Sequence, residues 1–148
     1  MVNSIRLKFL LSVVVSLVSV YSMSGQVIRT IASTSGNNMV HYIQIYEYNS
    51  VDRRPSFPGG NIEMMKFINR ERNYPVEAYE NGIEGRVVCG FVVNTDGHIS
   101  DVVVMRGVEE SLDREAVRIV TSMPVWTAGY VSDSPVPVFC VVTIPFRR

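Results

Sequence analysis

Residues 85–105, which decide the fold, read GRVVCGFVVNTDGHISDVVVM. Apolar and small residues alternate through the first half, and Asn94–Gly97 then supplies the Asp-Gly pair that favours a tight turn. A second β-rich run follows from Ile99 to Met105. This pattern predicts an antiparallel β-hairpin. The second run does not alternate cleanly after Asp101, so we expect a β-bulge there.

Helical patterns precede this hairpin. Asn61 is the expected N-cap of a helix with one apolar face, formed by Ile62, Met65 and Ile68. Tyr74 is pushed to extended geometry by the proline that follows it, so the helix ends before that residue. A short helical segment, 76–80, then runs up to Asn81-Gly82.

After the hairpin, Ser111 is the expected N-cap of a second helix, which Pro124 ends. One face of this helix is apolar and consists of Leu112, Ala116, Ile119, Val120 and Met123. A loop then leads to a last strand at 136–146. The order predicts an α+β fold: a two-layer sandwich of two helices on a three-stranded, mainly antiparallel sheet, with the last strand beside the first or the second.

The N-terminal residues 1–25 have the features of a signal peptide. Arg6 and Lys8 precede an apolar run at 9–21, and Ser22–Ser24 has the small-x-small pattern that signal peptidase accepts. The alternative is an uncleaved inner-membrane anchor facing the periplasm. The run is shorter than the about 20 residues that span a bilayer, which favours cleavage and a periplasmic protein.

Residues 26–50 form a lead-in to the folded domain, which we expect at 51–148. A polar turn cluster at 33–38 separates the apolar stretch 27–32 from a segment at 39–48 that alternates well enough to be a strand. An extra N-terminal strand or hairpin is therefore expected before the domain.

Composition excludes several functional classes. Lys+Arg and Asp+Glu both number 14, so the net charge is zero and gives no reason to expect nucleic acid as a partner. His41 and His98 are the only histidines, and neither has a Cys or carboxylate at metal-ligand spacing. No residues form a catalytic constellation. We expect no enzyme, no cofactor, no metal site and no small-molecule substrate.

Two cysteines, Cys89 and Cys140, fall in predicted strands and share the parity of the apolar residues around them. We expect them on the same face of neighbouring strands. In an oxidising compartment they either form a disulfide or remain two buried thiols, and the sequence leaves both alternatives open.

The last strand is the candidate binding site. Pro137 and Pro145 stand near its two ends, and proline is confined to edge strands or strand ends because it cannot donate to a ladder. We therefore expect an edge strand. Either the segment at 39–48 covers this edge, or a partner's extended segment pairs with it by β-augmentation. The candidate partner-binding residues are Val138, Phe139, Cys140, Val141, Val142, Thr143 and Ile144.

Five motifs occur in serial order from about Val51 onward: FPGG (57–60), YPVEAYENGIEGRV (74–87), FVVNTDG (91–97), SLDREA (111–116) and MPVW (123–126). Together they resemble the TonB C-terminal domain family, in the version common in Bacteroidetes-type bacteria. The resemblance implies a periplasmic module that pairs its last strand with the Ton box of an outer-membrane TonB-dependent transporter. It also implies further partner contacts near Tyr74 and Pro75.

The resemblance is to a stand-alone version of the family with a signal peptide. Full energy transducers of the family have a membrane anchor that bears a histidine and a long Pro-rich spacer, and residues 1–50 match neither feature. Two alternatives to the binding module stay open. One is a self-associating domain, as an edge-paired or strand-swapped homodimer; the other is an anchored transducer whose leader is not cleaved.

Overall fold

The computed structural model describes residues 18–21, 27–34 and 40–148. The expected signal peptide falls mostly outside these residues, and within it only β1 (Val18–Tyr21) is described. Most of the expected turn cluster at 33–38 also lies outside the described residues.

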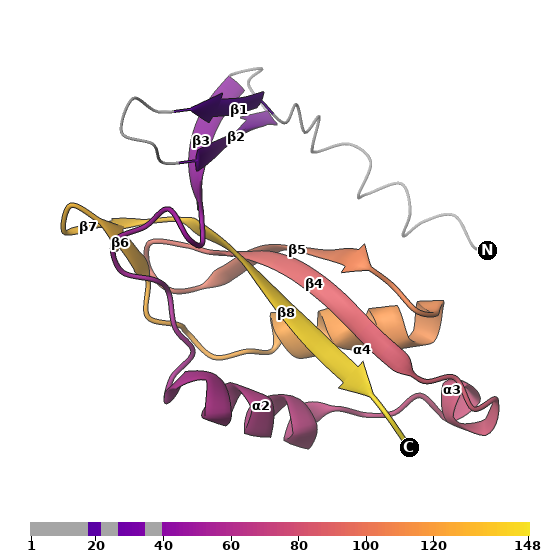
Figure 1. Cartoon of the computed structure of the whole chain (residues 1–148). Helices are drawn as coiled ribbons and strands as arrows, with labels where there is room; N and C mark the ends of the chain where they lie inside the picture. Colours follow the sequence, from indigo (N-terminus) through magenta and orange to yellow (C-terminus); the bar gives the residue numbers. More distant parts are fainter. Residues whose placement is uncertain (1–17, 22–26, 35–39) are drawn as a thin grey trace.

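Three strands form the centre of the molecule: β4 (Gly85–Val93), β5 (Ile99–Arg106) and β8 (Val138–Phe146). β4 lies between the other two and is antiparallel to both. This is the predicted three-stranded sheet, with the last strand beside the first strand of the hairpin. The α+β class is confirmed (Figure 1).

Helices α2 (Gly60–Glu71) and α4 (Glu110–Thr121) pack against one face of this sheet, and the short α3 (Val76–Glu80) follows α2. The core lies between the helices and the sheet. Its fully buried large side chains include Ile68 from α2, Leu112 and Ile119 from α4, and alternate residues of β4 and β8. Strand pleating places those alternate side chains on one face of the sheet.

The bulge expected in β5 is present near Asp101. The β4–β5 register shifts between Gly90 and Val92, where β5 has one residue more than β4, and Asp101 has a φ of 52°. A second shift occurs between Val88 and Cys89. Each bulge bends the strand and interrupts its ladder.

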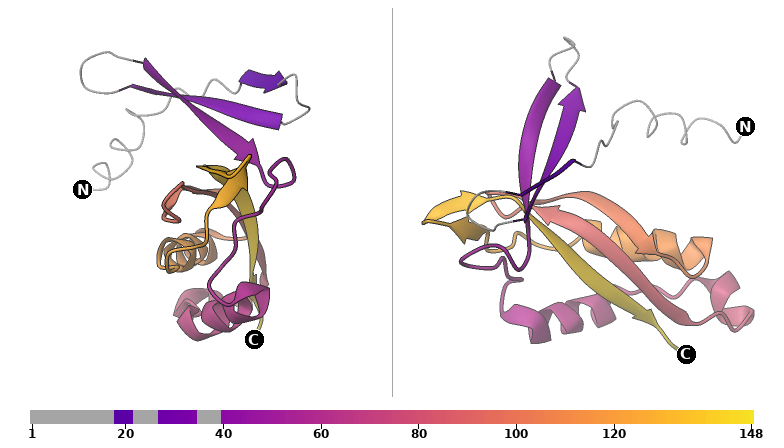
Figure 2. Two further views of the ribbon diagram at one scale, coloured as in Figure 1. Left: turned by 90° about the vertical axis from the view of Figure 1, so that its left-hand side faces the viewer. Right: turned by 45° about the horizontal axis from the view of Figure 1, so that its top comes forward.

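The N-terminal strands extend the sheet. β2 (Val27–Thr34) pairs with β1 and with β3 (Val40–Glu47), both antiparallel, and β3 then runs parallel to the start of β8. The sheet order is β1-β2-β3-β8-β4-β5. Figure 2 shows β2 and β3 projecting from the body that holds α2 and α4. The expected strand at 39–48 is therefore present as β3.

Some local predictions are wrong. α2 begins at Gly60 after Gly59, whose φ is 81°, so Asn61 is not its N-cap. α4 begins one residue before Ser111, because the side chain of Glu109 accepts hydrogen bonds from the backbone N–H groups of Ser111 and Leu112. A side-chain acceptor at the N-cap satisfies amides of the first turn that lack helical partners.

The loop before the last strand contains a small hairpin that the sequence does not predict: β6 (Gly129–Val131) and β7 (Ser134–Val136). Its turn residues Ser132 and Asp133 have φ values of 47° and 63°. Two successive positive φ angles characterise the tight hairpin turns that usually contain glycine or asparagine. The last strand consequently begins at Val138 rather than at residue 136.

Candidate functional site

Strand β8 is paired very differently on its two flanks. Along one flank it pairs with β4 over its full length, from Gly85↔Phe146 to Val93↔Val138, without a register shift. Along the other flank β3 pairs only with Val138 and Phe139. Beyond Phe139, no strand within residues 18–21, 27–34 and 40–148 pairs with this second flank.

Two hydrogen bonds identify the main-chain groups that face the second flank. The carbonyl of Pro137 accepts from the backbone N–H of Tyr46 (2.9 Å), and that of Pro145 accepts from the guanidinium of Arg72 (2.5 Å). Alternate residues of a strand direct their N–H and C=O groups to the same side. Val141 and Thr143 therefore present their main-chain groups outward. We call the outward-facing main chain of Val141–Pro145 the β8 flank.

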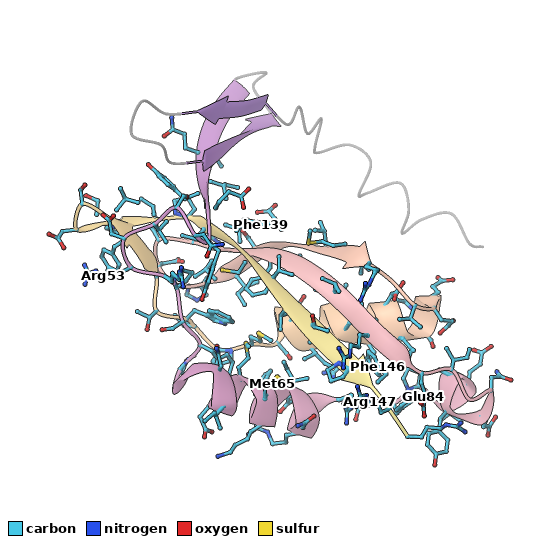
Figure 3. The ribbon with its side chains drawn as sticks, viewed as in Figure 1. Arg53, Met65, Glu84, Phe139, Phe146 and Arg147 are labelled. Carbon is cyan, nitrogen blue, oxygen red and sulfur yellow. The ribbon has the colours of Figure 1, made fainter. Side chains whose placement is uncertain are left out.

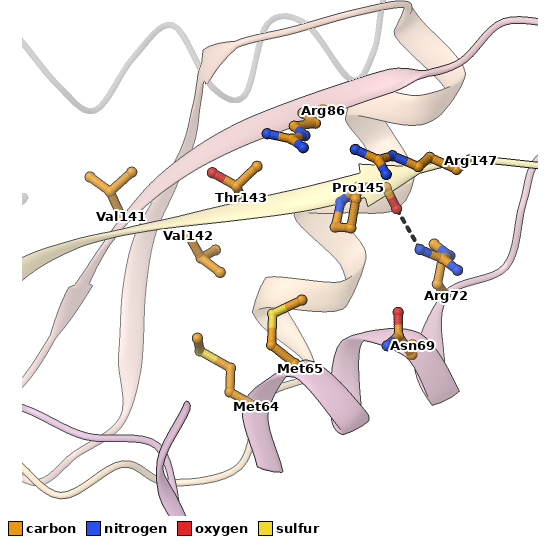
Figure 4. Close-up of a pocket in the computed structure, with 10 residues that line it drawn as sticks. All are labelled: Met64, Met65, Asn69, Arg72, Arg86, Val141, Val142, Thr143, Pro145 and Arg147. Atoms are coloured by element: carbon orange, nitrogen blue, oxygen red, sulfur yellow. Dashed lines mark hydrogen bonds between the residues drawn. The ribbon is translucent and has the colours of Figure 1, made fainter. Parts of the chain in front are cut away.

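A groove of about 610 Å³ lies between α2 and the β8 flank (Figure 4). Met64 and Met65 of α2 form one wall, with Asn69 one turn further along. Arg72, Arg86 and Arg147 surround the other end, near Pro145. The groove is therefore apolar toward Val141 and basic toward the C-terminus.

None of the three arginines of this groove forms an ion pair with a described carboxylate. Other arginines do: Arg114 pairs with Glu110 at 3.0 Å and Arg118 with Glu115 at 2.8 Å. The further pairs are Arg53–Asp133, Arg70–Glu71 and Arg148–Glu84. No acidic side chain lines the groove. Within the part of the chain that the structure describes, its basic end therefore has no ion-pair partner.

A second cavity of about 500 Å³ continues the groove toward the start of β8 and shares Met64 and Val141 with it. Trp126 lines this cavity and is 8% exposed. Its indole Nε1 is the only buried side-chain nitrogen or oxygen without a hydrogen-bond partner among the described residues.

The predicted site residues of β8 divide between the two faces of the sheet. Val138, Cys140, Val142 and Ile144 are buried against the helices, whereas Val141 is 53% exposed and Thr143 is exposed. Val138 and Phe139 are paired with β3, so the unpaired part of the predicted edge is shorter than expected (Figure 3). The segment at 39–48 covers the edge only at its first two residues.

Tyr74 and Pro75 lie at the far end of β8, where the structure gives them contacts within the chain. The hydroxyl of Tyr74 donates to the carbonyl of Ile83 at 2.6 Å, and its ring packs edge-on against Phe146, with centroids 5.7 Å apart. Pro75 precedes the first residue of α3. A partner contact of this pair stays a prediction.

The two cysteines lie on the same face of neighbouring strands, as their parity predicts. Cys89 lies opposite Val142 and Cys140 opposite Phe91, so they are diagonal neighbours. Diagonal residues are about 7–8 Å apart, which exceeds the usual separation of disulfide-bonded Cα atoms. Both thiols are free and buried in the structure, and a disulfide between them stays a prediction.

Burial makes these thiols unreactive. It raises the pKa of Cys140 to about 12 and that of Cys89 to about 11, with the charge of Asp113 adding to the shift at Cys89. The thiolate is the reactive form of cysteine, and at neutral pH it is scarce at both positions.

Neither a metal site nor a membrane span is found in the described residues. In residues 18–21, 27–34 and 40–148, no three His, Cys, Asp or Glu side chains are grouped to hold a metal ion. No helix of these segments combines the length and the apolar character that crossing a bilayer requires.

The sequence predicts the groove residues Val141, Val142 and Thr143 of β8, but not those that come from α2 or the three arginines. It assigned Met65 to the buried face of α2, together with Ile62, but these side chains are 40% and 73% exposed. The face that packs on the core instead carries Met64, Phe67 and Ile68. The strong bias toward arginine, with Lys8 and Lys66 as the only lysines, was the available signal for directional surface contacts. That bias does not locate the contacts.

Comparison with known families decides the identity of this fold. The family described as the Gram-negative bacterial TonB protein C-terminal matches residues 70–147. This chain belongs to the TonB C-terminal family. The match includes α3 through β8, and with them the β8 flank and the three arginines of the groove, whereas β1–β3 and most of α2 precede it. The family is associated with TonB-dependent transport.

Among solved structures, the chain is similar to two NMR solution structures of the Helicobacter pylori TonB C-terminal domain. One is 23% identical, with a TM-score of 0.44, and the match covers 58% of this chain and 90% of that one. The other is 21% identical, with a TM-score of 0.42, and the match covers 59% of this chain and 80% of that one. No curated protein matches the chain.

Proposed function

We propose that this member of the TonB C-terminal family is a non-enzymatic periplasmic binding module. It docks an extended segment, the Ton box of an outer-membrane TonB-dependent transporter, on the β8 flank by β-augmentation. The observation that carries the proposal is the pairing of β8: complete along β4, and limited to Val138 and Phe139 along β3. The main chain of Val141–Pro145 is left as a template for another strand.

The number of free main-chain groups on the β8 flank limits the affinity for the docked segment. Val141 and Thr143 supply two N–H and two C=O groups, while the carbonyl of Pro145 already accepts from Arg72. Each net hydrogen bond contributes about 0.5–1.5 kcal/mol, so four contribute about 2–6 kcal/mol before the cost of ordering the partner. Side-chain contacts in the groove must supply the rest. The expected affinity is weak to moderate.

Titration of the purified protein with synthetic N-terminal peptides of the TonB-dependent transporters from the same organism tests the docking. Val141→Pro removes an outward N–H without touching the β4 ladder, so it abolishes binding while the thermal midpoint stays close to that of the original protein. Val141→Ala is the matched control, because it keeps the main-chain donor and binds within a few-fold. Unchanged binding by Val141→Pro, or no binding by any transporter peptide, contradicts the proposal.

Cleavage of residues 1–25 decides whether the protein is free in the periplasm or anchored in the inner membrane facing it. N-terminal sequencing of the protein recovered from cells tests it, and a start near Gly25 or Gln26 is expected. A protein that keeps Met1 and sediments with the inner membrane supports the anchored transducer instead.

Self-association is the second candidate function, because the outward groups of Val141 and Thr143 can also pair with the same groups of another copy. Sedimentation at micromolar concentration separates the two functions. A monomer that binds peptide supports docking, and a constitutive dimer that peptide does not dissociate supports self-association.

A further inference from the structure

The described arginines divide into those that meet a carboxylate and those that do not. Arg53, Arg70, Arg114, Arg118 and Arg148 belong to the first group. Of the second group, Arg72, Arg86 and Arg147 line the one groove beside the β8 flank. They come from the end of α2, from β4 and from the C-terminus. The fold therefore gathers, from three separate segments, cations that have no ion-pair partner among the described residues.

No arginine at the basic end forms an ion pair with a described carboxylate. The carboxylate of Glu84 accepts from Arg148 twice, at 3.0 Å from its backbone N–H and at 3.2 Å from its Nε. The hydrogen bonds from Arg148, which lies outside the groove, are the main cause of the lowered pKa of Glu84, and the charge of Arg147 adds to it without forming an ion pair. Arg72 is held by the carbonyl of Pro145, which carries no net charge. Arg86 and Arg147 are exposed, and their guanidinium groups can contact a docked segment (Figure 4).

A strand that pairs with the β8 flank directs its side chains alternately to the two faces of the sheet. Figure 4 shows Arg86, Thr143 and Arg147 on one side of β8, and Met64 and Met65 on the other. Alternate side chains of the docked segment thus contact two chemically different surfaces, one basic and one apolar. Arginine offers planar, directional donors that fit a carboxylate, and methionine is an adaptable apolar surface.

We infer that the segment docked on the β8 flank is acidic on one face and apolar on the other. A carboxylate lies on the helix-free face, beside Arg86 and Arg147, and the alternate side chains on the α2 face are apolar and pack on Met64 and Met65. This inference rests on the proposed docking and assigns its side-chain specificity to this chain's own residues. It also fixes the place of the acid, opposite the C-terminal half of the flank.

The test uses the transporter peptide that binds best in the titration above, together with a twin in which each Asp or Glu is replaced by Asn or Gln. The original protein binds the twin about three- to tenfold more weakly, the range expected for a partly exposed charge pair. Arg86→Gln and Arg147→Gln lose a similar factor with the acidic peptide and lose nothing with the twin. Arg114→Gln is the matched control, because it removes the same charge from α4 outside the groove, and it binds both peptides as the original protein does.

Charge reversal gives a sharper readout. Arg147→Glu binds a peptide with Lys in place of its acid more tightly than it binds the acidic peptide, and the original protein shows the opposite order. Equal binding of the acidic peptide and its twin, or arginine variants that behave like Arg114→Gln, overturns the inference and leaves the docking proposal standing. If no transporter peptide binds at all, the docking proposal fails and the inference fails with it.

Discussion

Strands β8 and β5 lie on either side of β4, and their outer flanks differ. β8 keeps an unbroken register with β4 over nine residues, whereas β5 shifts register twice against the same strand. The exposed apolar side chains are more numerous on β5, where Val103, Val104 and Met105 are 49%, 37% and 53% exposed. Apolar exposure and backbone regularity therefore point to different edges.

The difference indicates how this sheet directs a partner to one edge. A bulge twists a strand and disrupts the spacing of its outward N–H and C=O groups, which prevents another strand from pairing along it. β5 has such protection, and β8 has none between Phe139 and Pro145. The regular main chain of β8, rather than the amount of exposed apolar surface, marks it as the docking edge in the function proposed above.

The largest effect is expected from proline placed on the paired side of β8. Val142→Pro removes the N–H that faces β4 and a buried side chain, so it lowers the free energy of unfolding by about 3 kcal/mol or more. Val141→Pro, one residue away, lowers it by less than about 1 kcal/mol because its N–H faces outward. Urea denaturation of both variants measures the contrast, and equal destabilisation would show that the two flanks of β8 are not distinct.

The next largest effect is expected at Gly90, which lies in β4 between β8 and β5. A Cβ at this position would lie 2.5 Å from the ring of Phe139 in β8 and 3.0 Å from the sulfur of Met105 in β5. Gly90→Val is therefore expected to cost about 1–3 kcal/mol by overpacking. Thermal denaturation measures the loss. Adding Phe139→Ala should recover part of it, and a double variant no more stable than Gly90→Val would show that Phe139 is not the obstacle.

A smaller effect is expected at the bulge of β5. Asp101 has a φ of 52°, a conformation that costs a β-branched residue about 1–2 kcal/mol. Asp101→Val should lower the free energy of unfolding by that amount, and Asp101→Gly should leave it nearly unchanged. Equal stability of the two variants, measured by chemical denaturation, would mean that β5 lacks this strained residue and the protection that it gives.

The smallest effect is expected from acid pH, which should weaken the start of α4 but not the β8 flank. The hydrogen bonds from Ser111 hold the pKa of Glu109, at the start of α4, below its usual value of 4.5. Because the folded-state pKa is lowered, the stabilisation is complete above about pH 4.5 and disappears as the pH falls through the folded-state value. The β8 flank has no ionisable side chain.

Hydrogen exchange, corrected for intrinsic rates, measures this difference. As the pH falls below 4.5, protection at the start of α4 should decrease before protection in β8. Glu109→Gln should remove the pH dependence at α4 and leave β8 unaffected. An unchanged pH profile in this variant would assign the acid sensitivity to other groups.

Features set by neighbours in the chain were predictable. The hairpin of β4 and β5, the bulge near Asp101 and the apolar stripe of α4 each follow from a local pattern, and the structure confirms them. The two N-cap predictions are wrong because a different neighbouring residue starts each helix. Gly59 provides a left-handed φ that starts α2 without a side-chain cap, and the longer side chain of Glu109 reaches the amides that Ser111 was expected to serve.

The groove could not be predicted in the same way. Arg72, Arg86 and Arg147 are separated by 14 and 61 positions in the sequence, and they meet only because β4 pairs with β8 and α2 packs beside them. The extent of β3 pairing is equally non-local. Its register with β8 depends on where the chain turns after Glu47, where the backbone N–H of Ser50 donates to the carbonyl of Glu47.

That turn has a mechanical consequence for any strand added beside Val141 and Thr143. β3 occupies the same line in the sheet and ends at Glu47, so its end is a physical stop for a visitor that slips toward the start of β8. Slippage the other way reaches Pro145, which has no N–H to offer and whose carbonyl is already in use. A docked segment would thus be held in one alignment by obstacles at both ends of the β8 flank.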